Sequence, residues 1–356
     1  MIRLQAEVTS KLNNTVEGLR AALQNAIELE HSTIPPYLYA LYSLKPGTNR
    51  VIAEIIRSVV LEEMLHMSLA CNVLNAVGGK PLIDSPTFIP EYPTHLPGTV
   101  QDQLVVGLQA FSLQLLSDVF MVIEEPEVPL EYPVVPPPKN ILAATFEAKP
   151  PMTIGQFYNA IMEEIRTLGP GIFTGDPKRQ VTANFKLLPL FPVNDKASAI
   201  KALGLIVDQG EGTKTSPIDV DKEPAHYYRY AEICKGYKLI RTPVPLPGTP
   251  PYIYGGERIR FEPIGVWPAL TNPQADSYSP GSPADIGNKA FNRTYTTLLK
   301  GLHTVFNGHP DHIATALLKM QSLHQQAGYL MSLPWGTGTA GPSFDYDATP
   351  AGKGNA

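Results

Sequence analysis

The sequence has little cysteine, no basic cluster and no long hydrophobic run. Its two cysteines, Cys71 and Cys234, lie far apart, each inside a predicted helix, and we expect buried free thiols rather than a disulfide. No apolar run reaches the about 18 residues of a membrane span, and Met1 to Asn14 lack the apolar core of a signal peptide. These absences predict a cytoplasmic protein that does not enter a membrane.

The charge balance narrows the range of partners. The net charge is −5 and no cluster of Lys and Arg occurs, which argues against nucleic acid. The glycine-rich segment 169–175 lacks the Gly-Lys-Ser/Thr ending of a phosphate-binding loop, which disfavours nucleotides. Hydrophobic residues make up 43% of the 356 residues, as in an ordinary globular protein, whereas the 36 prolines require long stretches that are not helix.

The most regular pattern of the chain surrounds Glu63 and His66. Apolar residues recur at alternating steps of four and three, which predicts a long helix over 49–77 with one buried stripe. Glu63 and His66 fall on that stripe, three residues apart, so both side chains are expected to point into the core. An unpaired buried carboxylate is costly, and a metal ion is the partner that Glu-x-x-His spacing suits best. Glu62 lies one step off the stripe and is expected to flank or support the site.

A second helical pattern, over 16–43, places Glu30 in the core. Glu30 takes the position of a hydrophobic residue on the apolar stripe of this segment. Pro35 and Pro36 follow, and prolines inside a helix remove hydrogen bonds and kink it at about 3 kcal/mol or more. We therefore expect either a kinked helix that shapes a site or a helix that ends and restarts.

Two acids compete for a third helix. Residues 153–168 are predicted to be helical, with Glu164 on the apolar stripe and therefore pointing inward. An earlier amphipathic helix, about 103–124, ends at Glu124, which is either a ligand or a capped surface acid, and the surface position is favoured. The proline-rich run that follows, 126–138, is expected to cover the surface as a stiff wrap or lid.

Two further candidates lie on either side of a polar loop. A helix predicted over 195–209 runs into Glu211, which has a glycine on each side and lies on the inward side of the helix. Helix resumes near Lys222, and His226 shares a face with apolar and aromatic residues. His226 is either a hydrogen-bonded core histidine or a metal ligand, and the nearby Glu211 favours the ligand.

The rest of the chain is predicted to cover the surface of the helical bundle and to add to its hydrophobic core. Residues 243–283 are rich in proline and aromatic residues, with a strand-like alternation at 257–262. Two amphipathic helices, 285–306 and 311–331, carry core-forming stripes without chemistry, and the last residues are expected to be a loose tail.

Together the candidate ligands offer oxygen and nitrogen atoms and no sulfur, a set that suits iron or manganese and also allows zinc. They are Glu30, Glu63, His66, Glu211, His226 and Glu164. A simple two-metal bundle carries two Glu-x-x-His pairs. Here Glu211 and His226 are fifteen residues apart, so a broken helix would have to bring them together.

Four strings of the sequence resemble a known family. They are residues 28–38 (ELEHSTIPPYL), 62–67 (EEMLHM), 210–212 (GEG) and 341–346 (GPSFDY). Over about residues 16–346 the chain is similar to the ferritin-like domain of the violacein and rebeccamycin type iminophenyl-pyruvate dimer synthases. The resemblance implies a mainly α fold, an up-down four-helix ferritin-like bundle with long Pro-rich crossovers and extra C-terminal helices. It also implies oxidative coupling of two imine forms of an aromatic 2-oxo acid.

We expect this fold to form one domain. Residues 1–240 would make the metal-binding bundle, with a long crossover at 78–152. Residues 241–356 would add the Pro-rich cover and two helices on the same core.

The predicted function is that of a non-haem oxidoreductase with two iron ions per chain, or manganese as the alternative. It would use O₂ or peroxide to oxidise or couple a small organic substrate derived from an aromatic 2-oxo acid or an amino acid. Tyr37 and His31 are the candidate catalytic residues, because the second atom of a metal ligand needs a hydrogen-bond partner. Two other functions stay open: dismutation of hydrogen peroxide by a dimanganese site, and a metal- or partner-binding module without turnover. The sequence leaves a homo-oligomer open.

Overall fold

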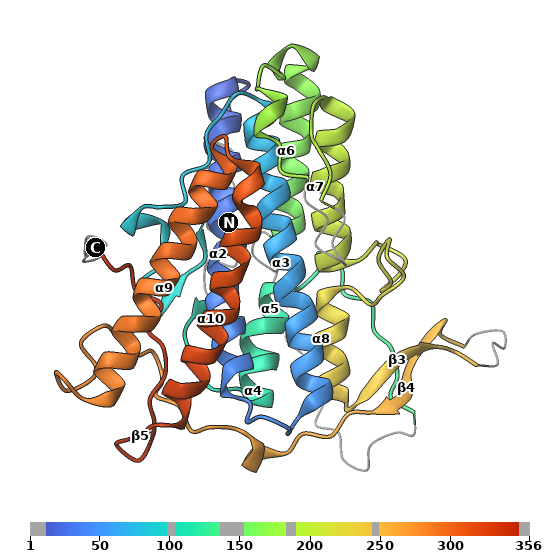
Figure 1. Ribbon diagram of the computed structural model, residues 1–356. Helices are drawn as coiled ribbons and strands as arrows, with labels where there is room; N and C mark the ends of the chain where they lie inside the picture. The colour runs from blue at the N-terminus through green and yellow to red at the C-terminus, as the bar shows by residue number, and fades with distance from the viewer. Residues whose placement is uncertain (1–11, 98–103, 136–152, 183–189, 244–248, 349–356) are drawn as a thin grey trace.

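A hairpin of two long helices forms the centre of the structure (Figure 1). The structure is a computed structural model and describes residues 12–97, 104–135, 153–182, 190–243 and 249–348. Helix α2 spans Val16–Ser43, helix α3 spans Arg50–Ala76, and the two pack against each other. Both helices predicted from the periodicity are thereby confirmed.

Helix α2 continues through Pro35 and Pro36 without ending. A proline lacks the N–H that would bond to the carbonyl four residues earlier, so Pro36 leaves the carbonyl of Ser32 without its helical partner. The hydroxyl of Tyr92 donates to that carbonyl at 2.7 Å. A side chain from the loop after α3 thus replaces the missing backbone bond and allows the helix to run on.

Opposite the hairpin, shorter helices fill the third and fourth positions of the bundle (Figure 1). Beside α2 lie α6 and a short helix, whose Phe120 ring is 4.5 Å from that of Tyr37 on α2. Beside α3 lie α7 and α8. The short helix consists of α4 (Leu113–Leu115), a π-helical turn (Leu116–Phe120) and α5 (Met121–Ile123); the others are α6 (Ile154–Leu168), α7 (Lys196–Glu211) and α8 (His226–Lys235). Two predicted starts were early: the helix expected from 103 begins at 113, and the one expected near 222 begins at 226.

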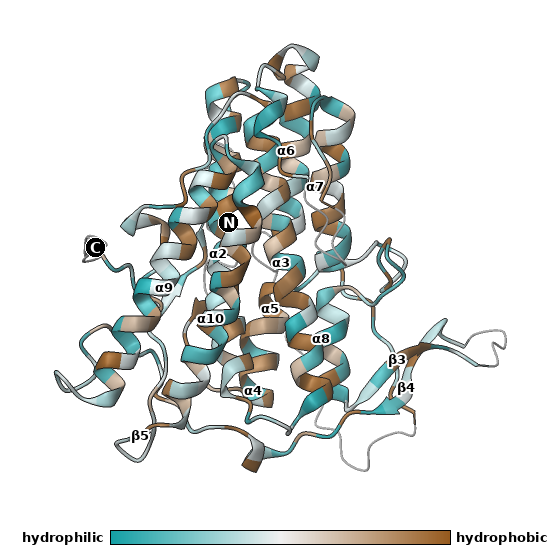
Figure 2. Ribbon diagram, viewed as in Figure 1, coloured by the Kyte–Doolittle hydropathy of each residue, from teal (hydrophilic) through white to brown (hydrophobic). Residues whose placement is uncertain are grey.

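Two C-terminal helices pack on the outer side of the hairpin. They are α9 (Pro283–Phe306) and α10 (Ile313–Ser332), and their buried residues belong to the same hydrophobic core as those of α2 and α3. Hydrophobic and hydrophilic bands alternate along these helices, as expected for elements with one buried face (Figure 2). The mainly α bundle with extra C-terminal helices is confirmed.

The remaining elements are small. Three antiparallel pairs of strands occur in the described ranges: β1 (Thr94–His95) with β2 (Val105–Val106), β3 (Tyr237–Arg241) with β4 (Tyr252–Arg258), and β5 (Pro334–Trp335) with β6 (Gly338–Thr339). Proline opens each of the short 3-10 helices, Pro86–Phe88, Pro170–Ile172, Pro177–Arg179, Pro263–Gly265 and Pro310–His312. The strand predicted at 257–262 lies earlier, in β4, which ends at 258.

Several expectations concern residues at the margins of the description. Cys71 and Cys234 are both free thiols, as predicted; Cys71 is buried, whereas Cys234 is only partly buried. Residues 136–138 of the proline-rich run, and most of the N-terminal and C-terminal tails, lie outside the described residues. Among the helices of the described ranges, none combines the length and the apolar character needed to cross a membrane.

Candidate metal centre

Five buried side chains meet at the level where the third and fourth positions of the bundle are interrupted. They are Glu30 from α2, Glu63 and His66 from α3, Glu124 directly after α5, and His226, the first residue of α8. They form two groups, Glu30 with Glu63 and His66, and Glu63 with Glu124 and His226, and within each group the ligand atoms lie within 4.8 Å of one another. Glu63 belongs to both groups, so one carboxylate links the two.

Each of the three carboxylates has one oxygen that accepts a hydrogen bond from a hydroxyl group of the chain. The hydroxyls come from α2 and α6. Two of them belong to Tyr37 and Tyr158, and burial raises the pKa of both tyrosines well above the usual range, so these hydroxyls stay protonated. The pairs are Tyr158 with Glu30 Oε1 (2.5 Å), Thr33 with Glu63 Oε2 (3.0 Å) and Tyr37 with Glu124 Oε1 (2.5 Å). These bonds fix the rotation of each carboxylate and direct its other oxygen to the centre.

The second oxygens face the Nδ1 atoms of the two histidines. His226 Nδ1 lies 2.9 Å from Glu63 Oε1 and 3.4 Å from Glu124 Oε2. His66 Nδ1 lies 3.6 Å from Glu30 Oε2 and 3.8 Å from Glu63 Oε1. The two imidazole rings stack with their centroids 5.4 Å apart. Three oxygens and two nitrogens thus converge on one small volume.

The tautomer of His66 follows from a chain of hydrogen bonds. Gln209, on α7, donates from Nε2 to a carboxylate oxygen of Asp221 at 2.7 Å, which fixes which end of its amide is the carbonyl. That carbonyl, Oε1, lies 2.9 Å from His66 Nε2. Because a carbonyl only accepts, His66 Nε2 must carry the proton. In the neutral ring Nδ1 therefore presents a lone pair to the centre.

His226 is held in the same way by Glu62. His226 Nε2 lies 3.0 Å from Glu62 Oε2, and Arg229 Nη1 lies 2.7 Å from Glu62 Oε1. Burial by itself would raise the pKa of Glu62, but the hydrogen bond from His226 and the charge of Arg229 lower it to about 2. Glu62 is therefore ionised and accepts the proton on His226 Nε2, so in the neutral ring, the form that binds a metal, Nδ1 has the lone pair. A carboxylate behind a ligand histidine is the usual support of metal sites.

The electrostatics of the five residues favour a cation. Burial, together with the charges of Glu124 and Glu30, raises the pKa of Glu63 to about 8. Burial opposes protonation of both histidines, yet the neighbouring carboxylates raise the pKa of each. Nδ1 of His226 is buried and makes no hydrogen bond of normal geometry within the described part of the chain. The centre thus attracts positive charge, either as protons on its histidines or as metal ions that would displace those protons.

Of the six ligands predicted from the sequence, the structure brings together Glu30, Glu63, His66 and His226. Glu211 is adjacent to the centre but in neither group: its carboxylate accepts a hydrogen bond from the backbone N–H of Gly155 at 2.6 Å, at the start of α6. Glu164 lies six residues after Tyr158 on α6, is buried, and also belongs to neither group.

Glu124, and not Glu164, lies with the other candidate ligands. The surface position favoured for Glu124 is wrong, because its side chain is 4% exposed and bonds to Tyr37. One feature of the sequence could have identified it: Leu116, Phe120 and Glu124 follow at steps of four, so Glu124 continues a buried stripe. Nothing local in the sequence points to Gln209 or Tyr158.

The two residues predicted to be catalytic have different positions. Tyr37 supports Glu124, as described above. His31 faces away from the five residues, with its Nε2 atom 2.7 Å from the hydroxyl of Tyr295 on α9 and its ring 4.4 Å from that of Phe88. Burial lowers the pKa of His31 to about 3, so its ring is neutral.

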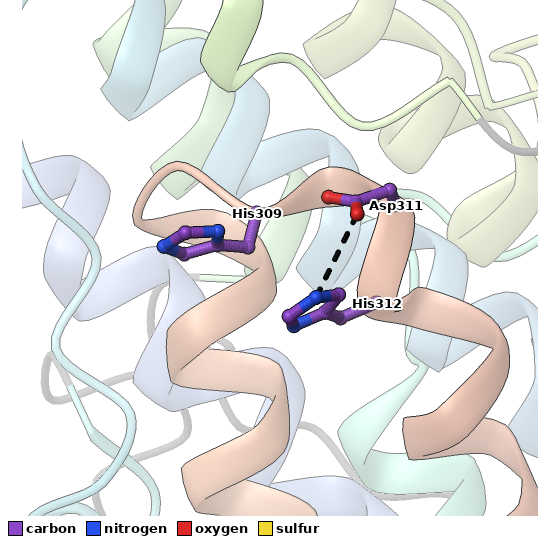
Figure 3. A group of neighbouring side chains, drawn as sticks. All are labelled: His309, Asp311 and His312. Atoms are coloured by element: carbon purple, nitrogen blue, oxygen red, sulfur yellow. Dashed lines mark ion pairs between the residues drawn. The ribbon is translucent and has the colours of Figure 1, made fainter.

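A third group of possible ligands lies on the surface (Figure 3). His309, Asp311 and His312 occupy the turn between α9 and α10, and Asp311 pairs with His312 at 3.6 Å. All three are exposed. Water already solvates their charges, so nothing in this turn requires an ion, in contrast to the buried centre.

A helical bundle that buries two carboxylate–histidine groups around a shared glutamate has the features of ferritin-like metal proteins. The sequence profile of the family described as Ferritin-like matches residues 23–235, more than half of the chain, and the chain belongs to this family. The matched range includes all five residues of the centre, and the match confirms the ferritin-like resemblance of the sequence motifs.

Two individual proteins are similar along most of the chain. Dichlorochromopyrrolate synthase from Lentzea aerocolonigenes is 24% identical over 398 aligned residues, which cover 95% of this chain and 37% of the synthase. The chain therefore spans little more than a third of the length of this relative. The solved structure of a ferritin-like protein from Caulobacter vibrioides, 24% identical, superposes with a TM-score of 0.60 and covers 92% of this chain and 97% of its own. The second match supports the fold alone.

Proposed function

We propose that the centre binds two transition-metal ions, iron in the first place, and that the protein is a non-haem oxidoreductase acting on a small organic substrate with O₂ or peroxide. The observation that carries the proposal is the arrangement of donors and acceptors. With both histidines neutral, as metal binding requires, all five inward atoms offer lone pairs, while hydroxyl groups, Gln209 and Glu62 occupy the outward atoms. Oxygen and nitrogen ligands without sulfur suit iron or manganese.

The residues of the chain have separate tasks in this proposal. Glu30, Glu63 and His66 would hold one ion, and Glu63, Glu124 and His226 would hold the other. When bound, the metals would supply the redox chemistry that activates O₂ or peroxide. The protein keeps the site buried and keeps protons on Tyr37 and Tyr158, whose hydroxyls hold the carboxylates in place.

The substrate class comes from the relatives. Dichlorochromopyrrolate synthase is named for the formation of a chlorinated aromatic product. The motifs of this sequence resemble those of enzymes that couple imines of aromatic 2-oxo acids. We therefore propose oxidation or oxidative coupling of a small aromatic 2-oxo acid or amino acid derivative.

Metal content tests the proposal directly. The protein would be produced with both iron and manganese, and its metals measured by elemental mass spectrometry beside a Glu63→Ala, His66→Ala double variant. A Glu54→Ala, His303→Ala double variant removes the same residue types from positions outside both groups and serves as the control. We expect two iron ions per chain in the wild type and the control and none in the Glu63, His66 variant, with circular dichroism unchanged.

The outcomes separate the alternatives. Two iron ions together with rapid O₂ consumption by the ferrous protein would support the oxidase. Two manganese ions with O₂ release from hydrogen peroxide would replace it with a peroxide dismutase. The absence of stoichiometric metal from the wild type would overturn the proposal and leave a buried structural cluster.

A further inference from the structure

A second concave site lies on the other side of the α2–α3 hairpin. There α9 and α10 enclose, together with the hairpin, a pocket of about 320 Å³. Its walls are almost entirely apolar, made of leucine, isoleucine, methionine and phenylalanine side chains from all four helices. A volume in this range is the lower end of what ligand pockets in proteins have, so it can hold one small molecule.

The pocket is separate from the metal centre. On α3 its wall includes Leu61, Met64 and Ser68, whereas Glu63 and His66 project from the opposite face of the same helix. None of the five residues of the centre lines the pocket. The α2–α3 hairpin thus separates the five residues of the centre from the pocket.

The pocket is long. Its wall on α2 extends from His31 to Tyr42, and the eleven helical steps between these residues span about 16 Å. Its wall on α3 extends over the same number of residues, from Arg57 to Ser68. An elongated apolar space of this kind fits an extended chain better than a compact ring system.

The buried end of the pocket contains a polar atom without a partner. His31 is 3% exposed, and its Nδ1 atom makes no hydrogen bond with any described residue, although its Nε2 atom is paired with Tyr295. A buried polar atom without a hydrogen bond costs about 1–3 kcal/mol. A polar group on a ligand that reached this end would offset that cost.

The open end carries a positive charge without a counter-charge. Arg57 is exposed, lines the pocket and forms no ion pair within the described ranges. Tyr42 and His324 adjoin it, with their rings 5.4 Å apart. One guanidinium with a neighbouring phenol hydroxyl matches a single carboxylate, because both can donate hydrogen bonds to its oxygens.

We propose that this pocket binds a linear amphiphile, an apolar chain that ends in one carboxylate. The carboxylate lies at Arg57 and Tyr42, and the chain extends along the hairpin toward His31. A hydroxyl at the far end of the chain pairs with His31 Nδ1. This site does not depend on the proposed function, because no residue of the metal centre contributes to it.

Calorimetric titration with laurate, kept below its micellar concentration, tests the carboxylate contact. We expect saturable binding of one molecule per chain. Arg57→Gln should weaken it about tenfold, as expected for the loss of a charged hydrogen bond at a partly solvated site. Arg50→Gln is the matched control, because Arg50 is exposed on the same helix and does not line the pocket.

Two further measurements test the body and the buried end of the pocket. Leu61→Trp fills the space from a half-buried position and should abolish binding while circular dichroism and metal content stay unchanged. Omega-hydroxylaurate should bind the wild type several-fold more tightly than laurate does, and His31→Phe should remove the difference. Equal laurate affinity of the wild type and the Arg57 or Leu61 variant would overturn the proposal, as would the absence of saturable binding.

Discussion

Two tyrosines beside the candidate metal centre differ in one hydrogen bond, and this difference can be tested by single substitutions. Tyr37 and Tyr230 have ring centroids 5.6 Å apart and both are fully buried. The Tyr37 hydroxyl donates to Glu124, whereas the Tyr230 hydroxyl makes no hydrogen bond of normal geometry with the described residues. Tyr37→Phe should therefore lower metal affinity about 10- to 100-fold, as expected for loss of a support behind a ligand.

Tyr230→Phe is the control for this prediction. It removes a hydroxyl of the same kind from the same neighbourhood, but no bond to a ligand, so metal affinity should be unchanged. Affinity can be measured by competition with a metal-binding dye. Equal loss in both variants would show that Tyr37 acts through packing and not through its bond to Glu124.

The amide of Gln209 provides a second test at the level of single residues. Gln209→Leu removes the acceptor that keeps the proton on His66 Nε2, so the other tautomer, with the proton on Nδ1, becomes accessible. We expect metal affinity to fall about 10- to 100-fold although every ligand remains. Gln321→Leu, at an exposed position of α10, is the control. Unchanged affinity in the Gln209 variant would mean that the carboxylates alone fix the ring.

Glu211 links the centre to the dependence of stability on pH. Burial, with the charge of Glu124 in addition, raises its pKa to about 7 although the backbone N–H of Gly155 opposes the rise. In the unfolded chain its pKa is about 4.5, so the folded state binds this proton more tightly. The free energy of unfolding is therefore highest below pH 4.5, as far as Glu211 is concerned, and falls as pH rises through 7.

Glu211→Gln removes this titration. In the metal-free protein, the variant should gain stability relative to the wild type as pH rises from about 4.5 to 8, by on the order of 3 kcal/mol. Urea unfolding at a series of pH values, with excess chelator, measures the difference. Glu54→Gln, an exposed change on α3, should leave the profile unaltered. A Glu211 variant whose stability runs parallel to that of the wild type would contradict the assigned pKa.

At the scale of elements, the start of α6 packs closely against the end of α7 beside the centre. A Cβ atom on Gly155 would lie 2.5 Å from Glu211 Oε2, so the carboxylate occupies the space of the missing side chain. Gly155→Ala should therefore destabilise the protein by about 1–3 kcal/mol, the usual cost of overpacking. Gly204→Ala, inside α7 with no atom within 4 Å of its Cβ position, should stabilise it by about 0.5–1 kcal/mol. Chemical denaturation at one pH checks the opposite signs.

The helices differ in how well the sequence pattern predicts them and the residues they place in the core. Helices α2 and α3 were predictable because each keeps one apolar stripe over many turns, and an acid on such a stripe, as with Glu30 and Glu63, is conspicuous. The third position of the bundle is divided, and its lower piece is a short helix with a π-helical turn just before Glu124. A short interrupted helix gives a weak periodic pattern, so the sequence pattern favours the longer α6 as the third helix and Glu164 as its ligand.

The residues that hydrogen-bond to the candidate ligands could not be predicted from the sequence for a different reason. Gln209 lies 143 positions from His66 in the sequence, and Tyr158 lies 128 positions from Glu30. Such pairs depend on how four separate helices are placed around the hairpin, which local patterns do not determine. Glu62 was predicted as a flanking or supporting residue because it adjoins the stripe, and the structure adds its partners, His226 and Arg229.

At the scale of the whole molecule, the hairpin of α2 and α3 carries both sites. Its inner face contributes Glu30, Glu63 and His66 to the centre, and its outer face forms half of the apolar pocket. The other two residues of the centre, Glu124 and His226, lie at the ends of short helices. Short helices have little stability of their own and depend on contacts with the rest of the protein. We therefore expect the centre to contribute strongly to the cohesion of the bundle.

Removal of metal tests this contribution. Without cations, three buried carboxylates converge, and either they repel one another or they must take up protons. A metal that binds only the folded state stabilises it by about 4 kcal/mol when its concentration exceeds the dissociation constant a thousandfold. Chelation should therefore lower the unfolding temperature of the wild type by several degrees and leave the Glu63→Ala, His66→Ala variant unaffected. Calorimetry with and without chelator measures both, and an equal shift in the two proteins would assign the effect to the chelator and not to the centre.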